Sequence, residues 1–279
     1  MTRHRFDPTR TTVLRRRFEG DLARRFRRLK GRVNDVLVED DTFGFRVQQE
    51  RFEFVRPEQK VASFMDWLRS EQDRGILEIQ PGASVERAAR SSWMNIYIDT
   101  AYIRGLRQAL GHIERQGAEV SERWIEQAFF RPIHADRVGL IYTRAYSQLK
   151  GITEAMDQQI SRELAQGVAE GRHPRVIARR INNRIDHIGI TRARLLARTE
   201  VISSHAEASL NAYEEAGIEG VEVEAEFSTA GDSRVCSECA ALEGHTFTMS
   251  EARGIIPVHP NCRCAWLPVV EDARGVTLQ

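Results

Sequence analysis

The residues of this sequence that could do chemistry are four cysteines and one histidine near its C-terminal end. Cys236 and Cys239 form a C-x-x-C pair, and after nineteen intervening residues His259 and Cys262 form a second pair with the same spacing, followed by Cys264. A C-x-x-C turn presents two thiolates to one metal ion, and a second pair that returns after a hairpin-sized loop can complete a tetrahedron. This spacing is typical of zinc ribbons and predicts a zinc site in which five candidate ligands compete for four positions.

The same cysteines allow three other interpretations, namely unpaired thiols, disulfides and thiol–disulfide redox chemistry. Disulfides are disfavoured in a reducing cytoplasm, and a thioredoxin-like site would require its C-x-x-C at a helix N-terminus with no further Cys/His cluster. The choice of four ligands also stays open, because Cys264 can replace His259 or Cys262. Four protein ligands would close the coordination sphere, so the predicted zinc is structural rather than catalytic.

A catalytic zinc site is a separate hypothesis, because zinc deaminases combine H-x-E with a later C-x-x-C. The segment His205-Ala206-Glu207 does precede Cys236 and Cys239. However, His205 is expected about fourteen residues inside a helix that follows Thr191, whereas a deaminase needs its His and Glu at an open pocket. Val235 also stands where that signature has proline. No phosphate-binding loop, dinucleotide fingerprint, nucleophile elbow or metalloprotease motif is present, so we predict no catalytic residue and no enzymatic activity.

Charge is distributed unevenly along the 279 residues, whose formal net charge is +1. Residues 1–33 carry twelve Lys and Arg against three acidic residues, a net charge of +9, so the remainder of the chain is acidic. Apolar residues recur every three or four positions between these arginines, as in a basic amphipathic helix. We expect this arm to dock on an acidic partner or on DNA and to be disordered or partly helical until then; the alternative is a helix packed on the protein's own body.

The elements that must position the cysteines are mostly helices. The segments with helical spacing of apolar residues are 58–73, 84–111, 121–130, 135–149, 153–170, 175–187 and 192–216. Alternating aromatic and polar residues over 43–55 predict a hairpin, and strands expected at 221–227 and 266–270 flank the cysteines. We predict a predominantly helical α+β fold with a basic arm over 1–33, a long-helix body over 34–217 and a small zinc-ribbon-like β module over 218–279.

Membrane insertion and secretion are not expected. No run of about 18 apolar residues is present, and the sequence opens Met-Thr-Arg-His-Arg without an apolar core. We therefore expect a protein that is made and kept in a cytoplasm, with no membrane partner.

Three segments together resemble the phage Mu F-like minor head protein family, also called head morphogenesis proteins. They are Arg198-Thr199-Glu200, the stretch from Asp232 through Cys236 and Cys239 to Gly244, and Pro257-Val-His259-Pro-Asn-Cys262-Arg-Cys264. The H-P-N-C-R-C ending after C-x-x-C is the specific part of this resemblance, which covers residues 150–268. Earlier segments, Phe130-Arg-Pro-Ile-His134 and residues 147–153, are similar to the helical leader of such proteins.

The resemblance implies a minor capsid protein of a tailed bacteriophage. Such a protein would join the assembling head, associate with the portal protein and the inner capsid surface, and influence DNA packaging or ejection. It would be found in the virion, in the head interior or at the portal vertex, and in the host cytoplasm during assembly. The alternative function is a nucleic-acid-binding zinc-ribbon module, because the basic arm could neutralise phosphates of packaged DNA. A zinc deaminase or nuclease ranks third.

Overall fold

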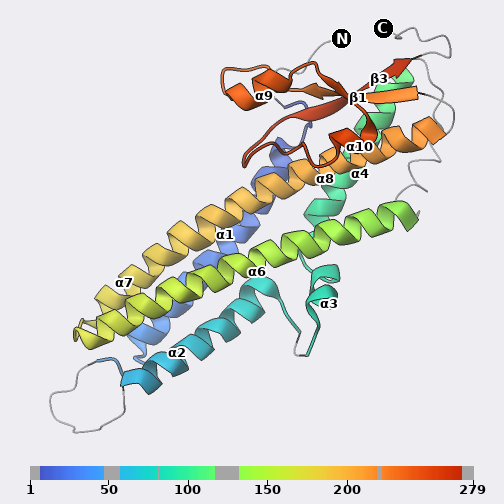
Figure 1. The fold of residues 1–279 in the computed structure, drawn as a ribbon. Helices are drawn as coiled ribbons and strands as arrows, with labels where there is room; N and C mark the ends of the chain where they lie inside the picture. The colour runs from blue at the N-terminus through green and yellow to red at the C-terminus, as the bar shows by residue number, and fades with distance from the viewer. Residues whose placement is uncertain (1–6, 47–56, 81, 117–131, 219–221, 272–279) are drawn as a thin grey trace. The chain divides into compact units, whose positions relative to one another are not determined.

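The structure is a computed structural model, and it describes residues 7–46, 57–80, 82–116, 132–218 and 222–271 (Figure 1). The chain forms two compact units. The first comprises Met1–Phe18, Met94–Tyr142 and Ala197–Gln279, and the second comprises Glu19–Trp93 and Thr143–Leu196. Three long helices contribute to both units. The segment boundaries predicted from the sequence, after residues 33 and 217, stay predictions.

Helices make up most of the described residues. In chain order they are α1 (Thr12–Asn34), η1 (Asp35–Glu39), α2 (Pro57–Gln72), η2 (Asp73–Leu77), α3 (Val85–Arg90), α4 (Asn95–Arg115), α6 (Pro132–Ala169), α7 (Pro174–Arg184), η3 (Ile185–Ile190), α8 (Thr191–Ile218), α9 (Ser237–Leu242) and α10 (Met249–Ala252). The three η segments are π-helical turns that extend α1, α2 and α7.

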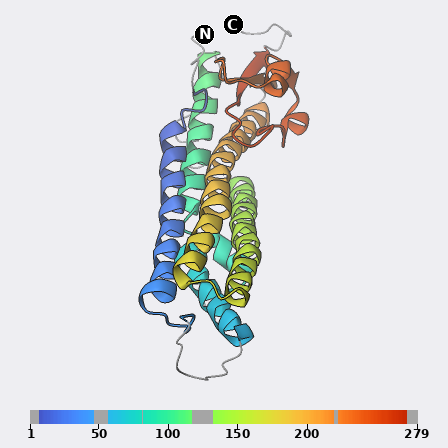
Figure 2. The same ribbon diagram turned by 90° about the vertical axis from the view of Figure 1, so that its left-hand side faces the viewer.

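The second unit packs the apolar face of α1 against η3 and the helices around it (Figure 2). Phe26 is fully buried, and a Cβ on Gly189 of η3 would lie 2.5 Å from its ring, so only glycine fits there. On the flank of this contact, Lys30 Nζ lies 2.6 Å from a carboxylate oxygen of Asp186. The same unit joins α2 to α6 through Gln72, whose amide donates to Asp157 at 2.6 Å.

The first unit is built on a close contact between α4 and α8. A Cβ on Gly105 would lie 2.4 Å from the carbonyl oxygen of His205 and 2.8 Å from the Cβ of Ala208. Beside this contact, the buried Tyr102 hydroxyl lies 2.7 Å from His134 Nδ1, and His134 Nε2 lies 3.0 Å from Glu215. This buried polar chain ties the beginning of α6 to both helices.

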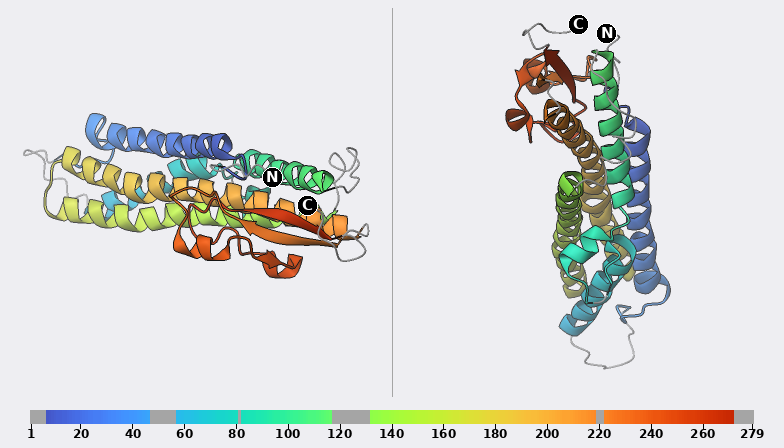
Figure 3. Two further views of the ribbon diagram at one scale, coloured as in Figure 1. Left: turned by 90° about the horizontal axis from the view of Figure 1, so that it is seen from above. Right: turned by 90° about the vertical axis from the view of Figure 1, so that its right-hand side faces the viewer.

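A small antiparallel sheet completes the first unit beside α4 and the end of α8 (Figure 3). Its strands are β1 (Glu222–Ser228), β2 (Thr246–Phe247) and β3 (Ala265–Glu271), in the order β2-β1-β3. Phe227 pairs with Trp266, which is 1% exposed and makes edge contacts with Phe227 and Phe247. The Tyr213 hydroxyl of α8 donates to the Trp266 carbonyl at 3.1 Å. The predicted fold class, a helical body with a small C-terminal zinc-ribbon-like β module, is confirmed.

The structure differs from the predicted helices in two places. The helix predicted over 84–111 is interrupted at residues 91–94: Ser84 does cap α3 by accepting from the Arg87 N–H at 3.3 Å, and a new helix, α4, begins at Asn95. The two helices predicted over 135–149 and 153–170 are one continuous helix, α6. Thr153 does not cap a new helix because its hydroxyl donates back to the Lys150 carbonyl at 2.7 Å, inside the preceding turn.

The structure also decides the prediction for the basic arm, whereas two other predicted elements cannot be compared with it. Of the two alternatives for the basic arm, the structure shows a helix packed on the protein's own body, because Phe18, Leu22, Phe26 and Val33 are fully buried. The helix predicted over 121–130 and most of the hairpin predicted over 43–55 lie outside the described residues.

In the described part of the chain, no helix has both the length and the apolar character that a membrane span would need.

Gly105 provides a direct test of the α4–α8 contact. Gly105→Ala should destabilise the protein by about 1–3 kcal/mol, because the added methyl group would collide with backbone on α8 that cannot move aside freely. Gly111→Ala in the same helix is the matched control, since its Cβ would lie 3.6 Å from the flexible end of Arg115. The control should be neutral or stabilising by up to about 1 kcal/mol. Urea denaturation measures both, and equal stability of the two variants would contradict the close packing.

Candidate metal centre

The first two candidate ligands are held by the short helix α9. Cys236 occupies the N-cap position, where its sulfur accepts the backbone N–H of Cys239 at 3.4 Å. Cys239 follows one turn later and is 3% exposed. The C-x-x-C spacing therefore places both sulfurs at the same end of one helical turn.

The other three candidates lie in the loop that leads into β3. Asn261 has a φ of 68°, a left-handed conformation that asparagine adopts more readily than most residues, and the backbone N–H of Cys262 donates to the His259 carbonyl at 3.0 Å. This tight turn reverses the chain between His259 and Cys262. Cys262 and Cys264 are both buried, at 2% and 3% exposure.

All five candidate ligands predicted from the sequence converge in the structure. His259 Nε2 lies 3.2 Å from the sulfur of Cys236 and 3.2 Å from that of Cys239. Cys239 also belongs to a second group with Cys262 and Cys264, and within each group the ligand atoms lie within 4.8 Å of one another. Such a cluster can hold a metal ion.

The orientation of His259 suits metal coordination. Its Nδ1 donates to the Pro260 carbonyl at 2.8 Å, which leaves the lone pair of Nε2 directed at the two sulfurs. Histidine ligands in proteins are commonly oriented by such a hydrogen bond from the second ring nitrogen. In tetrahedral zinc sites, sulfur and nitrogen ligands are separated by about 3.5 Å, close to the 3.2 Å distances here. The donor set of sulfur and imidazole is also the set that zinc prefers.

The four thiols differ in how readily they ionise. The Cys239 N–H lowers the pKa of Cys236, and a hydrogen bond from the Cys264 thiol lowers the pKa of Cys262 to about 5. Burial raises the pKa of Cys239 to about 12, and the hydrogen bond to Cys262, together with burial, raises the pKa of Cys264. The sulfurs therefore cannot all ionise together on their own, because their negative charges would repel one another. A divalent cation at their centre would compensate this repulsion.

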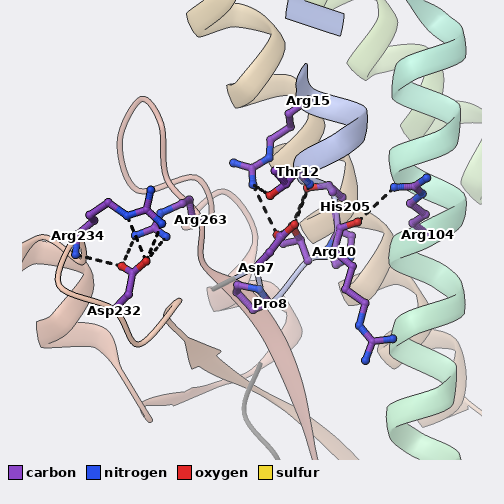
Figure 4. A network of polar contacts seen from close by, with 12 residues as sticks. Asp7, Pro8, Arg10, Thr12, Arg15, Arg104, His205, Asp232, Arg234 and Arg263 are labelled. Atoms are coloured by element: carbon purple, nitrogen blue, oxygen red, sulfur yellow. Dashed lines mark hydrogen bonds and ion pairs between the residues drawn. The ribbon is translucent and has the colours of Figure 1, made fainter. Parts of the chain in front are cut away.

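Polar contacts fix the loops that carry the ligands. Arg263, between Cys262 and Cys264, donates from its two terminal guanidinium nitrogens to the Asp232 carboxylate at 2.6 and 2.7 Å, and Arg234 donates to the same carboxylate at 2.8 Å (Figure 4). These bonds lower the pKa of Asp232, with the contact to Arg263 the largest cause. Asp232 thus joins the loop before α9 to the loop before β3.

Two arginines connect the cysteine module to α8. Arg198 of α8 donates to the side-chain oxygen of Asn261 at 2.9 Å, beside the tight turn of the ligand loop. Arg253, which follows α10, donates to Glu207 at 3.0 Å and to Asn211 at 2.9 Å, and also pairs with Glu214. The sequence analysis assigned no role to Arg253, because a single arginine outside a motif carries no local signal of its distant partners.

The deaminase hypothesis is not supported by the position of His205. This residue is 1% exposed in the α4–α8 contact, with its Nε2 3.3 Å from the side-chain oxygen of Gln108. Glu207 is engaged by Arg253. Among the residues that the structure describes, His205 belongs to none of the groups of potential metal ligands. Burial lowers its pKa to about 4, as is typical of an imidazole enclosed in a protein interior.

The fold and the Cys/His cluster define a small C-terminal module that could hold a metal ion, attached to long helices. Residues 158–267, from the second half of α6 to β3, match the family described as Phage Mu protein F like protein. The resemblance to this family is therefore confirmed over these residues, which are similar to Mu F-like phage head morphogenesis proteins. The family is one of structural phage head proteins. No curated protein and no solved structure matches the chain.

The buried His205 should make the free energy of unfolding depend on pH. Because its pKa is lowered from 6.5 to about 4, the unfolded chain binds a proton between these values that the folded protein excludes. The free energy of unfolding should therefore fall as the pH falls from about 6.5 to 4, with His205 contributing on the order of 3 kcal/mol.

His205→Gln should remove this contribution, whereas His187→Gln at an exposed position should not. Urea denaturation at pH 6.5 and 4.5 measures the difference. Any loss of metal in acid affects all the proteins alike, so it cancels in the comparison. A His205→Gln variant with the same pH dependence as the unmodified protein would show that His205 is not excluded from protonation.

Proposed function

We propose that this protein is a minor component of a tailed-phage head that attaches to the portal protein and the inner capsid surface during assembly. In this role its C-terminal module is held in shape by zinc, and the protein acts in DNA packaging or ejection. The observation that carries the proposal is the Mu F-like match over residues 158–267, which includes α7, α8 and the whole Cys/His cluster. The long α4 and α8 helices would provide a rigid body for the contact.

Zinc is proposed because the module has only a small apolar core of its own. The sheet has three strands, one of them only two residues long, and its large buried side chains are chiefly Phe227 and Trp266. Small modules of this kind draw much of their folding free energy from a bound metal. Zinc held by Cys236, Cys239, His259 and either Cys262 or Cys264 would connect α9 to the loop before β3.

The portal contact is proposed for exposed apolar residues of the first unit. The apolar face of α8 is already covered within the protein, because residues such as Ile202, Leu210 and Tyr213 are about 1% exposed. By contrast, Ile96 of α4 and Leu140 of α6 are each 66% exposed. The portal would cover these two side chains, because apolar side chains at the centre of a protein contact are removed from water.

Zinc content tests the metal part of the proposal. Protein purified without chelator should contain one zinc ion per chain, and Cys239→Ser should lose the ion and lower the melting temperature of the module, since Cys239 belongs to both ligand groups. The exposed neighbour Ser237→Ala is the control and should retain zinc. Comparing Cys262→Ser with Cys264→Ser identifies the fourth ligand as the one whose loss removes the ion. Zinc-free protein whose melting temperature is unaffected by chelator would refute the structural role.

Co-purification tests the portal part of the proposal. When the protein is co-expressed with the portal protein of the same phage, the two should form a complex that survives gel filtration. The double variant Ile96→Glu/Leu140→Glu should weaken this complex at least tenfold, because two charges would be placed in an apolar contact. Val176→Glu, at a 39% exposed position on α7, is the control. An unmodified protein that does not associate with portal, in solution or in procapsids, would contradict the proposal.

A further inference from the structure

The solvent-facing side of α1 consists almost entirely of arginine. The exposed residues of this helix are Val13, Arg16, Arg17, Arg24, Arg27, Arg28, Gly31 and Arg32, while its opposite face is buried. A solvated helix surface ordinarily mixes both signs of charge, since like charges three or four residues apart destabilise the helix. The sequence predicted a basic amphipathic helix and left open whether it packs on the protein's own body, and the structure shows that the arginines lie on the exposed face of a packed helix.

The arginines of α1 fall into two rows. At 3.6 residues per turn, residues eleven apart lie nearly above one another, so Arg16 and Arg27 share one line along the helix. Arg17, Arg24 and Arg28 share a second line, because residues four or seven apart also lie on one side. From Arg16 to Arg28 the rows extend about 18 Å along the helix axis.

Two glycines lie between these rows. Gly20 and Gly31 are also eleven residues apart, and their line falls between the line of Arg16 and that of Arg24. A Cβ at either glycine would have no atom within 4 Å. Glycine is among the least favourable residues in a helix interior, and no neighbour within the fold requires it at these two positions. The two rows of arginine therefore border a shallow strip in which a ligand could approach the helix backbone closely.

Most of the arginine charge is available to a ligand. Arg24 pairs with Asp21 at 2.7 Å but is still 62% exposed, and Arg27 donates through Nε to the Ala23 carbonyl, which leaves its terminal nitrogens. Within the described residues, Arg16, Arg17 and Arg28 form no hydrogen bond or ion pair. The guanidinium group binds phosphate in a bidentate manner, which makes arginine well suited to a phosphate backbone.

We infer that this face of α1 binds the phosphate backbone of duplex DNA. A protein partner would require an apolar centre to the contact, and Val13 at one end is the single large apolar residue exposed on the helix. A surface of regularly spaced positive charge without an apolar centre instead matches a polymer of regularly spaced negative charge. The 18 Å of the two rows corresponds to about five phosphates of one strand. That the duplex is packaged phage DNA rests on the proposed function, but the binding itself does not.

DNA binding by the full-length protein tests this inference. Fluorescence anisotropy with a labelled 30-base-pair duplex of arbitrary sequence should show binding whose affinity falls about 10²- to 10³-fold between 50 and 200 mM NaCl, as expected for about five phosphate contacts. Arg17→Gln/Arg24→Gln/Arg28→Gln should lower the affinity at least tenfold at 100 mM NaCl. The same variant should reduce the slope of log affinity against log salt by about 3.

A matched variant controls for the loss of net charge. Arg87→Gln/Arg107→Gln/Arg162→Gln removes three exposed arginines from α3, α4 and α6, and should change the affinity less than about threefold. If both triple variants lose affinity equally, binding depends on net charge alone and the assignment to α1 is wrong. If the α1 variant keeps full DNA affinity but loses the portal complex, the face docks a protein and the inference is overturned.

The glycines provide an independent test. Gly20→Gln/Gly31→Gln leaves the charge unchanged and should raise the melting temperature, because glutamine is the better helix former. The same variant should weaken DNA binding several-fold by filling the strip between the arginine rows. A stabilised variant with unaltered DNA affinity would overturn the role of the glycines. Because DNA binding is measured without the portal, its failure and the failure of the proposed head function can be told apart.

Discussion

Four sulfur atoms and an imidazole nitrogen gather in two overlapping groups that share Cys239, each with its ligand atoms within 4.8 Å of one another, and most of the C-terminal module is arranged around this constraint. The hydrogen bond from Cys264 favours ionisation of Cys262, with a pKa of about 5, whereas burial opposes ionisation of Cys239. Such a group is stable as a set of thiolates only with a cation among them. Helix α9 and the turn at Asn261 are the two local structures that bring the donors together.

The module does not stand apart from the helices in the first unit. Arg198 reaches the turn that carries His259 and Cys262, and Arg253 reaches three acceptors on α8. Both contacts fall inside the part of the chain that matches the Mu F-like family, residues 158–267. Within the first unit, α8 therefore supports the ligand loops, and the ligand loops, once closed by metal, would fix the end of α8.

Short-range patterns were sufficient to predict the parts of this protein that are determined locally. The spacing of the cysteines and His259 identified the cluster, and alternating residues identified β1 and β3, because a knuckle or a strand is specified by a few adjacent residues. The continuity of α6 was missed because Thr153 can either cap a helix or bond back into one, and the sequence does not decide between them. Arg253 was missed because its partners lie about forty residues away. The burial of one face of α1 likewise depends on distant packing, which left two alternatives for the arm.

The central claim is that the converging side chains form one structural zinc site. X-ray absorption at the zinc K-edge on the purified full-length protein tests it most directly, because the spectrum reports the type, number and distance of the ligands. The account predicts a single four-coordinate zinc with three sulfurs at about 2.3 Å and one nitrogen at about 2.0 Å. A zinc bound only by oxygen and nitrogen, or a protein whose thiols bind no zinc, would contradict it.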